Sequence, residues 1–430
     1  MKILIVTYSY TPDLTPRAFR WSAVASELVK MGHEVHVLCA GCETDETNAA
    51  GGRATEHRVK DWFLNASTRV TPNSTTHSIA GGTGRALWWK SLARKWVRSI
   101  WRSSCWPDYA CGWVVPGALA ARALCSQHHF DWVISVSHPF TGHVAGWLAT
   151  RGAQHTKWLV DIGDPFSLMS EPAPNNLTIY ARLNRYIESR VIARAQMISV
   201  TTVATRRLYE THFPLSAAKM HVIPPLLSLP EPPMQLVRGV NAPIRLVFVG
   251  TLYSRLRSPR RLLECFAALV QAQPHTSLEL HFYGSVNDCA EQLSTHTKSA
   301  DSKVHVHGLV NRQTAFQAMY EADILVNIGN ESESQLASKV IEYMAMGKPI
   351  LNFISIANDT SVEALTDYPN TLTVAHTSQA DFTPAMFNAL CKFVLLPPPH
   401  DPTAAQRIRA QYSTEKVTRM YATLLEQSAP

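Results

Sequence analysis

Residues 323–353 constrain the fold more than any other part of the chain. They hold two short apolar runs, Asp323–Ile328 and Ile350–Phe353, which are typical of buried strands. Between the runs, Ser338–Gly347 has the signals of a short helix, because serine is a favoured N-cap residue and glycine suits the left-handed position after the last turn. Pro349 then prevents the helix from continuing. The order strand, polar loop, helix, strand predicts a βαβ unit and therefore a parallel sheet.

The first turn of that helix carries a cation and a carboxylate. Lys339 takes the first helical position, and Glu342 stands one turn later. A helix N-terminus attracts anions through its free N–H groups and its dipole, so the pair could hold a phosphate beside a hydroxyl-rich group. The alternative is an ordinary crossover helix whose polar residues face water. The segment alone does not decide between the two.

The same alternation of strands and helices runs through most of the chain. Strands are expected at residues 2–8, 34–38, 131–136, 157–162 and 197–201, and again at 244–250, 278–284 and 304–308, with helices at 17–30 and 403–425. This rhythm predicts an α/β fold built on doubly wound parallel sheets, which bind ligands at the carboxyl ends of their strands. A length of 430 residues favours two domains.

A proline-rich segment, residues 224–233, interrupts the rhythm and is interpreted as an interdomain linker. We therefore expect an N-terminal domain at 1–225 and a C-terminal domain at 240–402. A final helix at 403–430 is expected to cross back to the N-terminal domain. Residues 41–84 are rich in Gly, Thr, Asn and Ser, and this composition predicts a mobile insertion in the first domain.

Composition disfavours several classes of protein. Apolar residues make up 46% and charged residues 17% of the chain, which argues against extensive disorder. No apolar run approaches the ~18–20 residues that cross a bilayer, and the N-terminus is too short for a signal peptide, so a cytoplasmic location is expected. The eight cysteines lack the paired spacing of a metal site and are expected to be reduced. A net charge of +7 favours anionic partners.

The segment 85–102 gathers basic and tryptophan residues. On a helical wheel these two kinds of side chain fall on opposite sides. The tryptophan side includes Trp88, Trp89 and Trp96, and the basic side includes Lys90, Arg94 and Lys95. The pattern predicts an interfacial helix on an anionic membrane, and the concentration of basic residues beside tryptophans disfavours nucleic-acid binding. The alternative is a helix that packs its tryptophans on the domain core.

Three predicted strands in the C-terminal half end in glycine, at Gly250, Gly284 and Gly308. Glycine at these positions lets a backbone or a ligand approach the edge of the sheet closely. None of the three opens the G-x-G-x-x-G fingerprint of dinucleotide-binding domains. An NAD-linked oxidoreductase is therefore disfavoured.

Two such domains joined by a linker resemble the GT-B architecture, and the motifs resemble those of the family 4 retaining glycosyltransferases. The resemblance rests on Arg20 with 32–35, Asp161–Pro165, Gly250–Tyr253 with Arg257, and Lys339–Ile350. The last motif is the most specific and is similar to the form found in capsule, O-antigen and exopolysaccharide transferases. The resemblance implies sugar transfer from a nucleoside diphosphate sugar, with no metal and no other cofactor.

The resemblance assigns donor binding to the C-terminal domain. Arg257 and Lys339 are expected to neutralise the charge that builds on the leaving diphosphate, and Glu342 is expected to bind the nucleotide ribose. The other expected donor contacts are Gly250, Thr251, Gly284, Gly308, Ser334 and Ser338.

The resemblance assigns the acceptor to the N-terminal domain. Pro16, Arg17 and Arg20 are expected on the acceptor side, where Pro16 stiffens a loop that carries a glycine pair in relatives. His138 would bind a sugar hydroxyl or move the acceptor proton, or it is a surface histidine without a role. Asp164 has a direct role or caps a turn. Since no carboxylate stands out as a nucleophile, front-side attack within one ion pair is the expected mechanism.

Together these features predict a transferase that adds a sugar to a lipid-linked glycan during exopolysaccharide, capsule or O-antigen synthesis. It would sit peripherally on the inner face of the membrane. A GT-B sugar-nucleotide epimerase is one alternative, because it would share the donor pocket. A catalytically inactive nucleotide- or glycan-binding module is another. Ser334 keeps it open, because the family often has a second glutamate there, although Glu331 or Glu333 could take its place.

Overall fold

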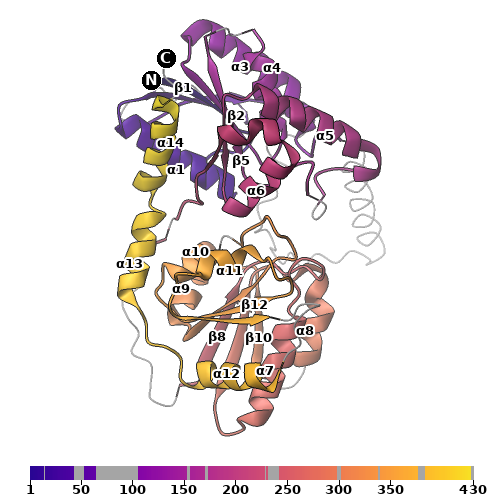
Figure 1. The fold of residues 1–430 in the computed structure, drawn as a ribbon, viewed down its shortest axis with the longest axis vertical. Helices are drawn as coiled ribbons and strands as arrows, with labels where there is room; N and C mark the ends of the chain where they lie inside the picture. The colour runs from indigo at the N-terminus through magenta and orange to yellow at the C-terminus, as the bar shows by residue number, and fades with distance from the viewer. Residues whose placement is uncertain are drawn as a thin grey trace, which may run out of the picture. The chain divides into compact units, whose positions relative to one another are not determined.

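The computed structural model of the chain consists of two compact units (Figure 1). Unit 1 comprises Met1–Pro224 and Val417–Pro430, and unit 2 comprises Pro225–Lys416. The structure describes residues 1–13, 15–42, 53–63, 105–152, 155–169, 173–227, 229–230, 242–297, 302–337, 339–375 and 383–427. Three predicted features lie outside these ranges. They are the predicted N-cap Ser338, much of the linker, and the predicted membrane contacts Trp88, Trp89, Lys90, Arg94, Lys95 and Trp96.

Unit 1 is built on a seven-stranded parallel sheet in the order β3-β2-β1-β4-β5-β6-β7. Its strands are β1 (Lys2–Val6), β2 (Glu34–Ala40), β3 (Thr55–Val59), β4 (Trp132–Val136), β5 (Lys157–Ile162), β6 (Met197–Val200) and β7 (Met220–Val222). Its helices are α1 (Pro16–Lys30), α3 (Val114–His128), α4 (Thr141–Thr150), α5 (Leu177–Arg194), α6 (Val203–His212) and, for most of its length, α14 (Thr414–Glu426). The strand order reverses between β1 and β4, which is the switch point at which doubly wound sheets bind ligands.

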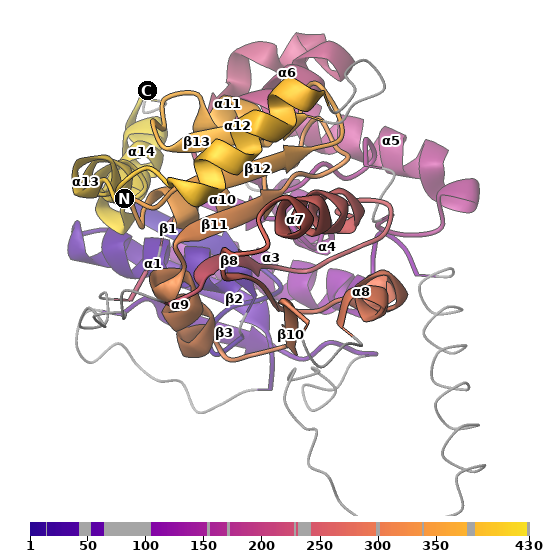
Figure 2. The ribbon, with the colours of Figure 1, turned by 90° about the horizontal axis from the view of Figure 1, so that it is seen from below.

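Unit 2 has a six-stranded parallel sheet in the order β10-β9-β8-β11-β12-β13, with its switch point between β8 and β11. Its strands are β8 (Ile244–Val249), β9 (Leu278–Tyr283), β10 (Val304–Gly308), β11 (Ile324–Ile328), β12 (Ile350–Ile354) and β13 (Thr371–Ala375). Its helices are α7 (Arg260–Ala272), α8 (Ala290–Thr297), α9 (Arg312–Glu321), α10 (Lys339–Met344), α11 (Thr360–Leu365), α12 (Pro384–Leu395) and α13 (Pro402–Gln411). Helices α7 and α12 lie on one face of the sheet, and α9 and α10 lie on the other (Figure 2). Apolar side chains of these helices pack against the two faces.

The predicted α/β fold with two doubly wound parallel sheets is confirmed, and local chemistry explains several element ends. Thr15 caps α1, since its Oγ1 accepts a hydrogen bond from Ala18 N at 3.2 Å and Pro16 occupies the first helical turn. After α10, Gly347 has the expected left-handed backbone, with φ of +69°. The predicted order of β11, α10 and β12 is therefore observed.

Two predictions at the periphery of the fold are wrong in part. Residues 55–59, inside the expected mobile insertion 41–84, form β3, which pairs in parallel with β2. The sequence of β3, Thr-Glu-His-Arg-Val, lacks the apolar alternation that marks a strand, so its pairing with β2 is a tertiary effect. The expected single helix near the C-terminus is two helices, α13 and α14. The break arises where Ser413 Oγ accepts a hydrogen bond from Lys416 N at 3.1 Å, as an N-cap does.

Asp161, near the end of β5, lies at the centre of a buried polar network in unit 1. Its carboxylate accepts hydrogen bonds from Trp21 Nε1 at 3.1 Å, Ser199 Oγ at 2.7 Å and Tyr421 Oη at 2.7 Å. Arg17 Nη1 lies 3.5 Å from the same carboxylate. The donors come from α1, β6 and α14, so one buried charge joins three elements that are far apart in the sequence.

Arg20 extends this network to the point at which the chain leaves unit 1. Its Nη2 donates to Tyr421 Oη at 2.8 Å and to Ile223 O at 3.2 Å, and its Nη1 donates to Pro224 O at 2.6 Å. Burial alone would raise the pKa of Asp161, but the nearby arginines and the hydrogen bonds outweigh burial and lower that pKa. The carboxylate therefore stays ionised inside the protein.

Another buried polar group in unit 1 is kept neutral rather than charged. His143 on α4 is fully buried, and its Nδ1 lies 2.9 Å from Ser135 Oγ, while its Nε2 has no hydrogen-bond partner among the described residues. Burial lowers the pKa of His143 to about 3. A protonated ring at this position would carry an unsolvated charge, so the folded protein keeps the ring neutral.

The hydroxyl of Tyr421 should make a measurable contribution to the stability of unit 1. We expect Tyr421→Phe to lower the free energy of unfolding by about 2–3 kcal/mol, because the change removes two hydrogen bonds to charged groups. The measurement is urea denaturation at pH 7. Tyr186→Phe is the matched control, since Tyr186 is 57% exposed and lies outside the network. Equal stability of the two variants would contradict the role given to the network.

His143 should make the protein less stable in acid. Between about pH 6 and pH 4 the unfolded chain binds a proton on this ring and the folded chain does not, so the free energy of unfolding falls as the pH falls. We expect His143→Gln to reduce that slope by about 1.4 kcal/mol per pH unit, the value for one proton. Urea titrations at several pH values measure both slopes. Coincident slopes would show that the ring is not kept neutral by folding.

Candidate functional site

The carboxyl ends of β8 and β11 are neighbours at the switch point of unit 2, and Arg257 joins the loops that follow them. Its Nε and Nη2 donate to Asn330 Oδ1 at 3.1 and 2.7 Å, and its Nη1 donates to Thr251 O at 3.2 Å. Asn330 is 4% exposed and is itself fixed, because its Nδ2 donates to Gln335 O at 3.0 Å. The guanidinium is thus held by neutral oxygen atoms from both loops.

The loop 250–257, here called the arginine loop, closes on itself. Tyr253 N donates to Arg257 O at 3.2 Å, and Arg257 N donates to Tyr253 O at 2.8 Å. Burial lowers the pKa of Arg257, but an arginine remains protonated at neutral pH. The arginine loop therefore presents a fixed positive charge.

Lys339 and Glu342 form an ion pair in the first turn of α10, with 2.5 Å between Nζ and Oε2. Lys339 Nζ also lies 5.5 Å from the centre of the Phe316 ring, a cation–π contact. One turn along α10, Tyr343 exchanges two hydrogen bonds with the backbone of Val249, the last residue of β8. This contact holds α10 beside the strand end that leads into the arginine loop, so both predicted cations belong to the same edge of the sheet.

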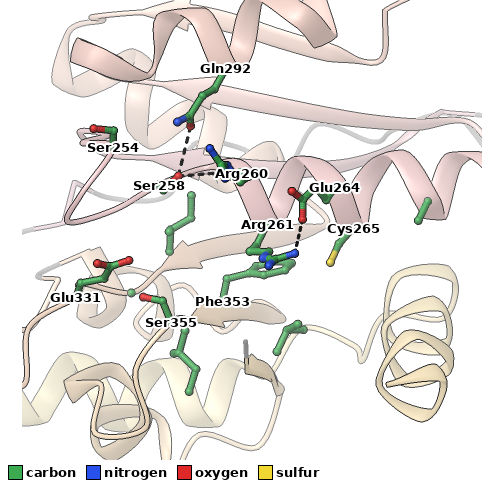
Figure 3. A pocket seen from close by; sticks show the side chains of 15 residues that line it. Ser254, Ser258, Arg260, Arg261, Glu264, Cys265, Gln292, Glu331, Phe353 and Ser355 are labelled. Atoms are coloured by element: carbon green, nitrogen blue, oxygen red, sulfur yellow. Dashed lines mark hydrogen bonds and ion pairs between the residues drawn. The ribbon is translucent and has the colours of Figure 1, made fainter. Parts of the chain in front are cut away.

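A pocket of about 500 Å³ opens beside the arginine loop (Figure 3). The apolar residues in its wall are Cys265, Ala268, Ile328, Phe353, Ile354 and Val374. Ser258, which follows Arg257, and Glu331, which follows Asn330, contribute polar groups. Ser258 Oγ donates to Gln292 Oε1 at 3.3 Å, as Figure 3 shows. The volume and the mixture of apolar and polar lining suit a small-molecule ligand.

The loop between β11 and α10 contains both Ser334 and the glutamates that could replace it. Ser334 is half-buried, and its Oγ lies 3.5 Å from Ser332 Oγ. Glu331 lines the pocket, whereas the Glu333 carboxylate accepts a hydrogen bond from Asn358 Nδ2 at 3.4 Å. Of the two glutamates, Glu331 is therefore the one placed beside a ligand-sized space.

The three predicted glycines meet at the carboxyl ends of their strands. Gly284 N donates to Gly308 O at 2.7 Å, and a Cβ atom on Gly284 would lie 2.0 Å from Gly250 O. Gly284 has φ of +124° and Gly308 has φ of +69°. The close approach predicted for these glycines is thus a backbone contact at Gly284, while a Cβ atom on Gly308 would have no atom within 4 Å. Donor contacts by these residues stay a prediction.

The acceptor-side residues lie in unit 1. His138 follows β4 at the switch point, is half-buried, and has its ring centre 5.8 Å from that of Tyr109. Asp164 is exposed in the loop after β5. Pro16 is exposed at the start of α1, and Arg17 reaches the buried carboxylate of Asp161. His138, Asp164 and Pro16 remain accessible to a ligand.

The prediction that Arg20 lies on the acceptor side is wrong. Arg20 is 5% exposed, and it donates hydrogen bonds to the backbone carbonyls of Ile223 and Pro224 and to Tyr421. Its contacts are internal, and they leave no surface for an acceptor. Asn330, which holds Arg257, is a site residue that the sequence motifs do not indicate. The sequence signal for it is a polar residue placed shortly after a buried strand, at the edge of the sheet where ligands bind.

Substitution of Gly284 and of Gly308 by alanine should lower the free energy of unfolding by different amounts. We expect Gly284→Ala to destabilise the protein by more than about 3 kcal/mol, because its Cβ atom would collide with rigid backbone. Gly308→Ala should lower the free energy of unfolding by about 1–2 kcal/mol, since the only penalty is that of alanine in a left-handed backbone conformation. Urea denaturation of the two variants measures the difference. Equal costs would show that the backbone at Gly250 yields easily.

Two protein-family models match the chain. Residues 243–391 match the model "Glycosyl transferases group 1", and residues 21–229 match the model "Glycosyltransferase Family 4". The first match lies in unit 2, and the second covers most of unit 1. No curated protein sequence matches the chain.

Solved structures share the fold at low sequence identity. Sucrose-phosphate synthase from Thermosynechococcus elongatus is 14% identical, with a TM-score of 0.61 and 99% of each chain covered. The lipopolysaccharide outer core galactosyltransferase WaaB in its apo form is 12% identical, with a TM-score of 0.59 and 100% of each chain covered. UDP-GlcNAc 2-epimerase from Methanocaldococcus jannaschii is 8% identical, with a TM-score of 0.52 and 100% of each chain covered.

The fold alone is thus shared by transferases and an epimerase, whereas both family models describe glycosyltransferases. The two matched ranges together account for most of both units. Sugar transfer is the activity that both family descriptions name. The chain therefore belongs to the family 4 glycosyltransferases with the GT-B fold.

Proposed function

We propose that unit 2 binds a nucleoside diphosphate sugar through its diphosphate, and that the protein transfers the sugar with retention of configuration. The observation that carries this proposal is the fixed guanidinium of Arg257 at the switch point, beside a pocket of about 500 Å³. A positive charge that is already positioned stabilises a leaving diphosphate without reorganisation during the reaction.

The hydrogen bonds of Arg257 leave it able to bind an anion. A guanidinium has about five N–H donors, and three of them are directed at Asn330 and Thr251. The remaining two make no hydrogen bond to a described residue and can bind phosphate oxygens, which arginine binds with good geometry. Since both partners, Asn330 and Thr251, are neutral, they position the guanidinium without neutralising its charge.

Lys339 and Glu342 supply the second part of the donor site. Their ion pair is partly exposed, with 31% of the Lys339 side chain and 20% of the Glu342 side chain accessible. A diphosphate competes well for a lysine in such a pair, because a partly exposed ion pair is worth only about 0–1 kcal/mol. The glutamate released in this way can accept hydrogen bonds from ribose hydroxyls.

Positioned cations also support a transfer that does not require a divalent metal, since they perform the charge neutralisation that a metal ion would otherwise supply. Front-side attack is the proposed route. Asp161 is unsuitable as a nucleophile, because three hydrogen bonds and the arginines occupy its buried carboxylate. His138 would then bind the acceptor hydroxyl or receive its proton. Asp164 is exposed in the loop after the neighbouring strand β5.

The acceptor proposed is a lipid-linked glycan on the cytoplasmic face of the membrane, in exopolysaccharide, capsule or O-antigen synthesis. The support comes from the sequence of residues 85–102, together with Trp62 and Phe63, which are 62% and 61% exposed. Large exposed aromatic side chains favour an interfacial surface. In the part of the chain that the structure describes, no helix is both long and apolar enough to span a bilayer.

Two variants test the donor site. We expect Arg257→Ala and Lys339→Ala each to reduce kcat/KM for transfer by about 100-fold or more, as loss of a preorganised charge-stabilising group does. Each should also reduce the rise in Tm that a nucleoside diphosphate gives the wild type. The measurement is a thermal-shift screen of nucleoside diphosphates and nucleotide sugars, followed by transfer assays with the donor that binds.

Lys392→Ala is the matched control for this test, because Lys392 is exposed on α12 and lies outside the proposed site. Full activity in the Arg257 or Lys339 variant would refute the role of that residue. Isomerisation of the nucleotide sugar without an acceptor would identify an epimerase instead. Binding without transfer or isomerisation across the donor panel would indicate an inactive module.

A further inference from the structure

A cluster of histidines and a glutamate lies at the β3 edge of the unit 1 sheet, apart from the residues considered above. Glu34 and His36 stand two residues apart on β2, so they share one face of the strand. His128, the last residue of α3, reaches the same place. One ligand-type atom from each of the three lies within 4.8 Å of the others.

The geometry of the cluster suits a metal ion. The His36 Nε2 atom is 3.1 Å from Glu34 Oε1, and the rings of His36 and His128 have centres 4.6 Å apart with planes tilted by 52°. Tilted rings allow two nitrogen lone pairs to point toward one ion. Tetrahedral zinc places its ligand atoms about 3.4 Å apart, so small side-chain rotations close the site. Three protein ligands leave a fourth position for water.

His57 on β3 stands where a supporting residue belongs. Its Nε2 is 2.9 Å from His36 Nδ1, the ring nitrogen that faces away from Glu34. Metal-bound histidines almost always donate their other N–H to a carboxylate, a carbonyl or a water, which fixes the ring. Here the His57 ring nitrogen can accept that hydrogen bond instead. Phe130 packs edge-on against the His36 ring with centres 5.1 Å apart, and His36 is 5% exposed. The central ligand is therefore held in a defined position.

One neighbouring cation competes with a metal ion for the site. Lys2 Nζ is 3.1 Å from Glu34 Oε1. That pair is exposed and therefore weak, so it can yield to an ion.

Unit 2 repeats the pattern on its corresponding strands. Glu279 and His281 stand two residues apart on β9, with 3.1 Å between His281 Nε2 and Glu279 Oε2. His281 Nδ1 lies 3.0 Å from His307 Nε2 on β10, and His305 completes a second cluster within 4.8 Å. Strands β3 and β10 are the corresponding edges of the two sheets in their strand orders. Here the His281 and His305 rings are stacked, with planes 27° apart, so the lone pairs converge less well.

We propose that Glu34, His36 and His128 bind a divalent transition-metal ion of the zinc class, with His57 as the residue that orients His36. Imidazole and carboxylate are ligands that zinc accepts. The ion would join β2 to the C-terminal end of α3, with β3 fixed beside them. This site is independent of the donor site, so neither proposal depends on the other.

The test is zinc titration by calorimetry of the full chain without a histidine tag, after removal of bound metal with a chelator. To isolate unit 1, all variants carry His281→Ala and His305→Ala. We expect this background to bind one Zn²⁺ per chain and to give the visible Co²⁺ absorption of a four- or five-coordinate site. Glu34→Gln should weaken binding by at least tenfold, and His36→Ala with His128→Ala should abolish it. His57→Ala should weaken binding by about 10–100-fold.

His129→Asn is the matched control. His129 is adjacent to His128 and exposed, and asparagine tolerates its left-handed backbone, with φ of +52°. This variant should bind Zn²⁺ as the background does. Glu34→Gln changes an exposed side chain and therefore keeps the test decisive if the histidine variants fold poorly. No binding by the background at about 100 µM Zn²⁺, or undiminished binding by Glu34→Gln and by the double histidine variant, would overturn the proposal.

Discussion

The architecture of unit 1 depends on keeping one carboxylate ionised in its interior. A buried charge costs several kcal/mol unless nearby charges and hydrogen bonds compensate it. Asp161 meets this requirement with donors from α1, β6 and α14. The Asp161 carboxylate therefore fixes the positions of all three elements. For this reason α14, which is remote in the sequence, is part of unit 1.

Arg20 fixes the path of the chain where it leaves unit 1 and where it returns. The chain leaves unit 1 after Pro224 and returns at Val417. Arg20 binds the carbonyls of Ile223 and Pro224 at the exit, and it binds Tyr421 shortly after the return. A single guanidinium thus fixes both crossings to the body of unit 1.

The sequence was sufficient to predict the fold wherever contacts between residues close in the chain determine the structure. The β11–α10–β12 unit was predictable because Gly347 and Pro349 limit the helix regardless of tertiary context. By contrast, β3 has no apolar alternation and exists through its pairing with β2. The environment of Arg20 could not be predicted either, because its partners lie about 200 and 400 positions away in the chain. In the candidate site, the cations were evident, but the support that Asn330 gives to Arg257 required the spatial meeting of two loops.

Two arginines in this protein show why residue type alone does not assign function. Arg20 and Arg257 both bind backbone carbonyls, and both appeared in motifs of the family. Arg20 is buried beside the Asp161 carboxylate, so its charge is compensated within the protein. Arg257 is half-buried, and its hydrogen-bond partners are an amide and a carbonyl, which orient it but do not neutralise it. An oriented charge without a compensating hydrogen-bonded anion attracts one from solution, and a diphosphate has the charge and the shape that a guanidinium binds well. The difference in their partners therefore makes Arg20 structural and supports the donor-binding role proposed for Arg257.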